Sequence, residues 1–228
     1  SKVVGQINDP CGTSTANATI VLTKHPTDPY SQGKDYIFWA ETNQSGHFEL
    51  DNVLKGTYSL LVYGANRTDD LNIQQIQIEE GLEDLELIQW STNTSEELLW
   101  QIGNADRRSD GYNLSTEPRQ YGLWEKPPAN IDFKIGESVE CEEFYYAQTK
   151  KGVWNISFDI ERSLSSYSEA KLVLAVAGVS KQPRLNVTIN DHALFDSVLQ
   201  RHKDSCIYRS AVHSGRYDKK ILYFKQNN

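Results

Sequence analysis

The chain has 228 residues, enough for one or two domains with a sufficient core, and its net charge is −8. The negative excess argues against non-specific binding to nucleic acid or to an anionic membrane surface. No apolar run approaches about 18 residues and no segment keeps a helical periodicity, so the sequence predicts a soluble, mostly β protein. Residues 201–228 hold seven Lys or Arg against two Asp or Glu. A solvated edge explains this basic end better than a surface for an acidic polymer.

The first part of the chain predicts a small β-sandwich. Alternating apolar runs separated by Gly-rich and Asn-rich turns indicate about six short strands. These runs are 2–7, 17–24, 36–42, 47–50, 57–63 and 73–78. The last of them alternates cleanly and is expected at a sheet edge. The acidic stretch 79–97, whose character changes around Trp90, is expected to be the linker.

The second part also predicts strands. Residues 153–160 place Trp154, Ile156, Phe158 and Ile160 on one face. The run 171–178 is apolar on both faces, which predicts a central strand covered on both sides. Further strands are expected at three positions: 185–190, 207–210 and 220–224.

Four aromatic and glycine-bearing phrases lie between these strand regions. They are Leu-Leu-Trp-Gln-Ile-Gly-Asn-Ala-Asp-Arg-Arg (98–108), Gln-Tyr-Gly-Leu-Trp-Glu (120–125), Ile-Asp-Phe-Lys-Ile-Gly-Glu-Ser (131–138) and Phe-Tyr-Tyr-Ala-Gln (144–148). Their glycines and the Pro127–Pro128 pair indicate turn-rich β structure. We expect Trp100, Trp124, Phe133 and Phe144 mainly to pack against a sheet.

In this order and spacing, the phrases resemble the third domain of the rhamnogalacturonan lyases of polysaccharide lyase family four. The pattern Gly-X-Phe-X-Leu at 46–50, repeated as Gly-X-Tyr-X-Leu at 56–60, is similar to the fibronectin-III-like or transthyretin-like module that precedes that domain, although this pattern alone is not specific. The resemblance implies an all-β chain, with a fibronectin-III-like spacer at 1–90 and a jelly-roll carbohydrate-binding-like domain at 91–228. It covers only the two domains that follow the catalytic one.

Both chain ends are expected to be incomplete. The chain contains no methionine, so Ser1 is not expected to be the start of a translation product. Relatives of this type continue beyond the strand near Phe224 into one more strand, whereas this sequence stops at Asn228. An open jelly roll exposes an unpaired edge, so we expect either a fragment or a closing strand from a separate chain.

The resemblance supplies no catalytic residue. Such lyases cleave by β-elimination, in which a base removes a proton next to a carboxylate that cations neutralise, but the family places those groups in the absent domain. The five histidines show no spacing for a triad or a metal: His25, His47, His192, His202 and His213. No cofactor is expected. Many Asp and Asn side chains leave room for a structural calcium ion, yet no loop has a recognisable ligand pattern.

A carbohydrate site in the second domain needs aromatic faces and polar groups that fix hydroxyl and carboxylate geometry. For binding a uronate polymer the expected residues are Arg107, Tyr121, Trp124 and Tyr146, because they lie in turn-rich segments and combine these groups. A face packed on the missing catalytic domain uses the same residue types. The cluster of Asp106 with Arg107 and Arg108 can be a structural ion pair or part of a ligand surface, and we favour the structural ion pair.

Sequons and cysteines indicate the compartment. Seven Asn-X-Ser/Thr sites exceed the roughly two expected by chance, which favours a secreted glycoprotein over compositional drift. They are Asn17, Asn43, Asn66, Asn93, Asn113, Asn155 and Asn186. Three cysteines leave one unpaired, and we expect a Cys141–Cys206 bridge within the second domain, with Cys11 free or joined to the missing part. Their spacing excludes a zinc–thiolate motif.

The leading hypothesis is the non-catalytic portion of a secreted lyase that acts on pectic polysaccharide. A second hypothesis is a secreted interaction or adhesion protein that reuses the two β domains to contact a protein partner. A third is one piece of a processed lyase, still joined to a separate catalytic chain. Neither nucleic acid nor a membrane is expected as a partner.

Overall fold

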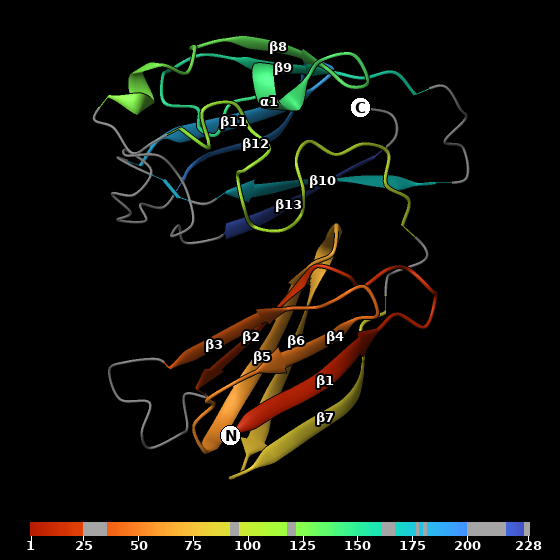
Figure 1. Cartoon of the computed structure of the whole chain (residues 1–228). Coiled ribbons are helices and arrows are strands. Elements are labelled where there is room, and N and C mark those ends of the chain that lie inside the picture. The colour runs from red at the N-terminus through yellow and green to blue at the C-terminus, as the bar shows by residue number, and fades with distance from the viewer. Residues whose placement is uncertain are drawn as a thin grey trace. The chain divides into compact units, whose positions relative to one another are not determined.

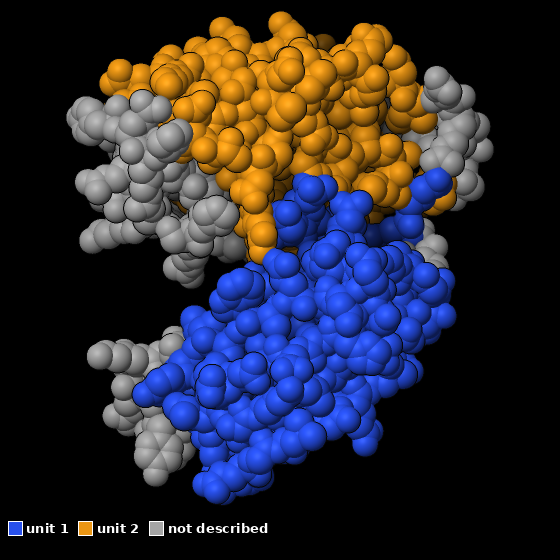
Figure 2. Space-filling model, viewed as in Figure 1, with its two compact units in different colours: residues 1–97, 104–106 blue, residues 98–103, 107–228 orange. Residues whose placement is uncertain are grey.

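The computed structural model (Figure 1) describes residues 1–24, 36–91, 96–117, 122–160, 167–176, 178–179, 182–199 and 218–225. These residues form almost only β-strands, with one short 3-10 helix and one short α-helix, which confirms the all-β class. In the described part of the chain, no helix is long and apolar enough to cross a membrane. The chain divides into two compact units (Figure 2): unit 1 is 1–97 with 104–106, and unit 2 is 98–103 with 107–228.

Unit 1 is built from two sheets that face each other across one core (Figure 1). The antiparallel four-stranded sheet has the order β3-β2-β5-β6, so the predicted edge position of residues 73–78 is confirmed. In the second sheet, β1 pairs antiparallel with β4 and parallel with β7. The strands are β1 (Lys2–Asn8), β2 (Ala18–Lys24), β3 (Ile37–Glu41), β4 (His47–Leu50), β5 (Gly56–Gly64), β6 (Arg67–Ile78) and β7 (Leu82–Gln89).

Strand alternation fills this core. In β5, Tyr58, Leu60 and Val62 are fully buried, and the residues between them point outward. In β2, Ile20 and Leu22 follow the same pattern. Because successive side chains of a strand point to opposite faces, an alternating sequence gives each sheet one buried face. Full burial of each large apolar side chain contributes about 1.5–3 kcal/mol.

Gly5 makes room for an aromatic ring in the core. It lies opposite Phe48 in the β1–β4 register. A Cβ atom added at Gly5 would stand 2.8 Å from Cζ of Phe48, and Phe48 keeps only 4% of its surface exposed. The ring therefore occupies the space that any other residue at position 5 would fill.

The prediction of a linker at 79–97 is wrong for most of that stretch. Residues 82–89 form β7, and Trp90 is part of the buried core with 3% exposure. Leu85 packs against this core, while the acidic Asp84 and Glu86 point to solvent. Carboxylates on the outer face gave the stretch the composition of a linker although its inner face belongs to the sandwich.

Unit 2 contains three two-stranded pairings among its described residues. β8 pairs with β9 in parallel, whereas β10 with β13 and β11 with β12 are antiparallel. The elements are η1 (Leu123–Glu125), β8 (Ile131–Lys134), α1 (Glu140–Glu143), β9 (Trp154–Ser157), β10 (Glu169–Val176), β11 (Arg184–Ile189), β12 (His192–Val198) and β13 (Asp218–Lys225). The expected strand at 207–210 lies outside the described residues.

Aromatic side chains provide much of the core of unit 2. Phe144 stands edge-on to Phe133 and Trp154, with ring centroids 5.6 and 5.1 Å away, and 5.4 Å from Tyr112. Trp100 packs on Phe158 in a separate pair, with ring centroids 5.1 Å apart. Such edge-to-face contacts stabilise beyond the area they bury. The predicted packing role is confirmed for Trp100, Phe133 and Phe144, and Trp124 is half-buried.

Two strand predictions for unit 2 need correction. β10 was expected to be a central strand covered on both faces, but in the described part of the chain it pairs with β13 alone, its residues are half-buried and Ala175 is exposed. Apolar composition on both faces therefore did not produce full burial. The predicted strand 153–160 is regular only over β9, although Trp154 and Ile156 do point inward and Asn155 outward.

Candidate functional site

The segments of Trp124 and Tyr146 are joined by hydrogen bonds. Trp124 lies in η1, which begins after Gly122 at a φ of 87°. The Thr149 hydroxyl donates to the carbonyl oxygen of Trp124 at 2.5 Å, and Nζ of Lys150 donates to the next carbonyl, that of Glu125, at 2.7 Å. The loop that follows Tyr146 is therefore fastened to the turn that carries Trp124.

A second set of bonds ties the segment that follows Arg107 to Tyr146. The backbone N–H of Asn113 donates to the carbonyl of Phe144, and the N–H of Tyr146 donates to the carbonyl of Asn113. Arg107 has a φ of 60°, in the left-handed region that few non-glycine residues adopt. Trp124 and Tyr146 thus lie on segments joined by side-chain-to-backbone hydrogen bonds, and the segment after Arg107 is joined to that of Tyr146 by backbone hydrogen bonds. Tyr121 lies outside the described residues.

Tyr146 is one of the residues expected to bind a uronate polymer. Its side chain is half-buried, and its hydroxyl oxygen is buried without a hydrogen-bond partner among the described residues. Burial raises the pKa of this phenol above its usual value. The indole Nε1 of Trp154 is likewise buried and without a partner in this part of the structure.

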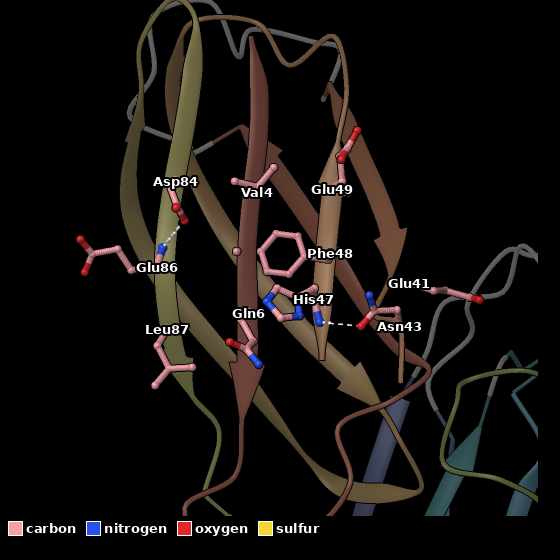
Figure 3. A pocket seen from close by; sticks show the side chains of 11 residues that line it. Val4, Gln6, Glu41, Asn43, His47, Phe48, Glu49, Asp84, Glu86 and Leu87 are labelled. Atoms are coloured by element: carbon pink, nitrogen blue, oxygen red, sulfur yellow. Dashed lines mark hydrogen bonds between the residues drawn. The ribbon is translucent and has the colours of Figure 1, made fainter. Parts of the chain in front are cut away.

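A depression of about 700 Å³ lies on the outer face of the β4-β1-β7 sheet (Figure 3). The sequence reading did not predict it, because three segments distant in the chain line it. Figure 3 shows Val4 and Gln6 of β1 in the middle, His47 and Glu49 of β4 on one side and Asp84, Glu86 and Leu87 of β7 on the other; Gly5, Glu41, Asn43 and Phe48 complete the lining.

This depression is acidic. Glu41, Glu49, Asp84 and Glu86 contribute four carboxylates, and the ammonium of Lys2 pairs with Glu49 at 2.5 Å. An array of like charge repels a polymer of the same sign, so this surface does not suit a polyuronate. No group of three or more His, Cys, Asp or Glu in the described ranges is arranged to hold a metal ion.

Comparison with known proteins agrees with the two-part organisation. A model of "Polysaccharide lyase family 4, domain II" matches residues 12–84, and a model of "CBM-like: Polysaccharide lyase family 4, domain III" matches residues 98–227. The chain belongs to polysaccharide lyase family 4. The expected order of a fibronectin-III-like module and a carbohydrate-binding-like module is confirmed by these two matches.

Rhamnogalacturonate lyases are among the relatives of this family 4 chain. The enzyme of Dickeya dadantii is 36% identical over 90% of this chain and 36% of its own length. A probable rhamnogalacturonate lyase B of Aspergillus niger is 25% identical over 92% of this chain and 37% of its own length. The chain therefore spans little more than a third of these relatives. A solved cohesin–X–dockerin complex of Acetivibrio cellulolyticus aligns with 38% of the chain and 52% of its own at a TM-score of 0.28 and 24% identity.

The sequon asparagines of this family 4 chain differ in their surroundings. Asn17, Asn43, Asn66 and Asn186 are exposed. Asn155 is exposed as well, and its Nδ2 donates to Asp132 at 3.1 Å. Asn113 is half-buried and its Nδ2 donates to the carbonyl of Glu142. A glycan would replace one of the two hydrogens on that nitrogen and crowd this bond. Asn93 lies outside the described residues.

The cysteine prediction remains open. Cys141 is exposed on α1, and its expected partner Cys206 lies outside the described residues. Cys11 is exposed in the loop after β1, where its backbone N–H donates to Asp9 at 2.9 Å. The Cys141–Cys206 bridge is thus still a prediction.

Proposed function

We propose that this chain is the non-catalytic, carbohydrate-binding portion of a secreted rhamnogalacturonan lyase, and that its unit 2 binds pectic polysaccharide for a β-eliminating catalytic domain. The match of residues 98–227 to a CBM-like domain III is the observation that carries this proposal. The names of the relatives make a rhamnogalacturonan chain the expected ligand. The excess of sequons supports secretion.

Binding in unit 2 is assigned to the segments of Arg107, Trp124 and Tyr146, together with Tyr121. A guanidinium holds a carboxylate with two parallel hydrogen bonds, and an indole stacks on the apolar face of a sugar ring. The buried hydroxyl of Tyr146 supplies a donor inside the unit rather than a stacking face. A sugar polymer that carries carboxylates suits this combination of charge and aromatic surface.

Affinity electrophoresis in gels that contain rhamnogalacturonan tests this function. Arg107→Asn is the suitable variant at that position, because asparagine tolerates the φ of 60° that an alanine would strain. Trp124→Ala retains the backbone carbonyl that Thr149 bonds. Both variants should migrate faster through the polymer than the wild type does. The control is Tyr223→Ala, which removes an aromatic that is 60% exposed on β13, and it should be retarded as strongly as the wild type.

Two results would speak against this function. Migration of the wild type that the polymer leaves unchanged would favour the protein-interaction alternative. Steady growth of the ultraviolet absorbance of an unsaturated product, from the isolated chain, would show a catalytic site within these residues.

A further inference from the structure

The outer face of the β3-β2-β5-β6 sheet carries an exposed aromatic platform. Trp39 is 62% exposed, and Ile37, two residues earlier on the same strand, is 58% exposed. The alternate residues Phe38 and Ala40 point inward and pack against the core. Trp39 therefore lies on a strand whose other side packs on the core, and its indole faces solvent.

The strand registers place further side chains beside the indole. One row across the sheet is Trp39–Val21–Leu61–Asn72. The next row starts with Ile37–Thr23–Ser59, and the row on the other side is Glu41–Thr19–Tyr63. We call these residues, with Gln74, the Trp39 face. Neighbouring strands lie about 4.8 Å apart and rows about 7 Å apart, so the face extends about 14 Å in each direction.

Polar side chains on β5 and β6 form a ladder next to the apolar row. The hydroxyl of Ser59 donates to Oε1 of Gln74 at 2.8 Å, and Nε2 of Gln74 donates to Oδ1 of Asn72 at 2.5 Å. Each amide has two donor hydrogens and an acceptor oxygen with two lone pairs, which is more than these bonds use. The ladder fixes the amides while leaving hydrogen-bonding capacity directed to solvent.

The charge of the Trp39 face favours an uncharged ligand. Among the described outward residues of these four strands there is no Lys or Arg, and Glu41 and Asp70 are negative. The described residues of this face therefore offer no Lys or Arg to hold the carboxylates of a polyuronate. Uncharged hydroxyl-rich rings fit better, because one aromatic plane covers the apolar side of a ring and fixed amides bond its hydroxyls.

We propose that the Trp39 face is a second saccharide site, which binds a neutral pyranose segment of a polysaccharide with a ring stacked on Trp39. This inference rests on the proposed function for the class of ligand, and it adds a surface in unit 1 with a different charge preference. Unit 2 would hold the acidic backbone of the polymer, and unit 1 would hold neutral sugars.

Proton–nitrogen NMR of the tryptophan indoles tests the proposal with a neutral galactan oligosaccharide. The Trp39 signal, assigned by its loss in Trp39→Phe, should shift and saturate, while that of Trp90, which is 3% exposed, should stay in place. Trp39→Ala should weaken galactan binding about tenfold. The control is Leu82→Ala, which removes a side chain 68% exposed on the other sheet and should bind as the wild type does. An unmoved Trp39 signal, or equal affinities for wild type and Trp39→Ala, would overturn the proposal.

Separate polymers keep the two proposals distinguishable. Retardation by rhamnogalacturonan without any galactan shift at Trp39 would remove this inference and leave the proposed function intact. A galactan shift at Trp39 without retardation by rhamnogalacturonan would support the saccharide site on the Trp39 face and speak against the proposed function of unit 2. Polygalacturonate that shifts the Trp39 signal as strongly as galactan does would contradict the charge argument.

Discussion

Nη2 of Arg67 lies 3.0 Å from Oδ2 of Asp9, and the two side chains keep only 4% and 0% of their surface exposed. The guanidinium also donates to the carbonyl of Trp90 at 2.6 Å and lies 4.4 Å from the centre of that indole ring. Asp9 accepts a further bond from the N–H of Cys11. This ion pair therefore joins the loop after β1, the start of β6 and the end of β7.

Breaking this pair should strongly destabilise unit 1. Arg67→Met leaves the carboxylate of Asp9 buried without its cation, and a buried charge deprived of its partner costs about 3–5 kcal/mol. Urea unfolding should show this loss in the free energy of unfolding. Burial lowers the pKa of Arg67, and the charge of Asp9 opposes that shift.

An exposed pair provides the comparison. Lys55 and Glu79 are 60% and 61% exposed, so Lys55→Met should change the free energy of unfolding far less than Arg67→Met does. Equal losses in the free energy of unfolding for Arg67→Met and Lys55→Met would show that the buried pair stabilises unit 1 no more than the exposed pair does.

Gly5→Ala should destabilise unit 1 by about 1–3 kcal/mol, because the new methyl group would overlap the ring of Phe48. The double variant Gly5→Ala with Phe48→Leu should lose less than the sum of the two single changes. Chemical unfolding of all three variants measures this coupling. Strict additivity would show that the ring and position 5 do not compete for space.

Asn113→Gln should cost about 1 kcal/mol, since it displaces the amide that bonds the carbonyl of Glu142. Asn186→Gln, at an exposed sequon, should be neutral within about 0.5 kcal/mol. Thermal unfolding compares the two variants. Peptide mapping of secreted material should then find glycan at Asn186 and none at Asn113, and full occupancy of Asn113 would contradict the structure.

The hairpin of β11 and β12 should weaken in acid. Arg184 donates to both carboxylate oxygens of Asp196, at 2.6 and 2.7 Å, and these hydrogen bonds lower the pKa of Asp196 below its ordinary value of 3.8. A carboxylate with a depressed pKa adds stability above its unfolded pKa, and this stability is lost as the pH falls through the folded pKa. An NMR titration of Asp196 should show the depression in the wild type. It should be smaller in Arg184→Lys, which keeps the charge but not the two-pronged geometry. Identical titration in both proteins would contradict this assignment.

The sequence predicted the strands of unit 1 because alternation survives wherever one face is buried. The prediction from sequence failed at β7, which pairs in parallel with β1. The outward carboxylates of Asp84 and Glu86 made this stretch look like a linker, although the inward side chains of the strand pack against the core. The prediction from sequence also overestimated the burial of β10, because an apolar composition does not determine which other strands cover a strand.

The binding residues were harder to predict than the strands. Residue type identified Trp124 and Tyr146 as aromatic groups in turns, but only packing shows that the hydroxyl of Tyr146 points into the unit. Trp39 reads as one more alternating aromatic, and its exposure follows from the absence of a further described layer over its side of the sheet. The acidic depression is invisible in the sequence because β1, β4 and β7 are brought together by the fold.

The most direct test of the central claim combines binding and cleavage in one sample of rhamnogalacturonan. Equilibrium dialysis of the isolated chain against rhamnogalacturonan oligosaccharides small enough to cross the membrane, with the ultraviolet absorbance followed over the same period, should show an excess of oligosaccharide on the protein side and no increase in unsaturated product. Equal oligosaccharide concentrations on both sides, or a steadily rising absorbance, would contradict an account in which these two domains hold pectic polysaccharide without cleaving it.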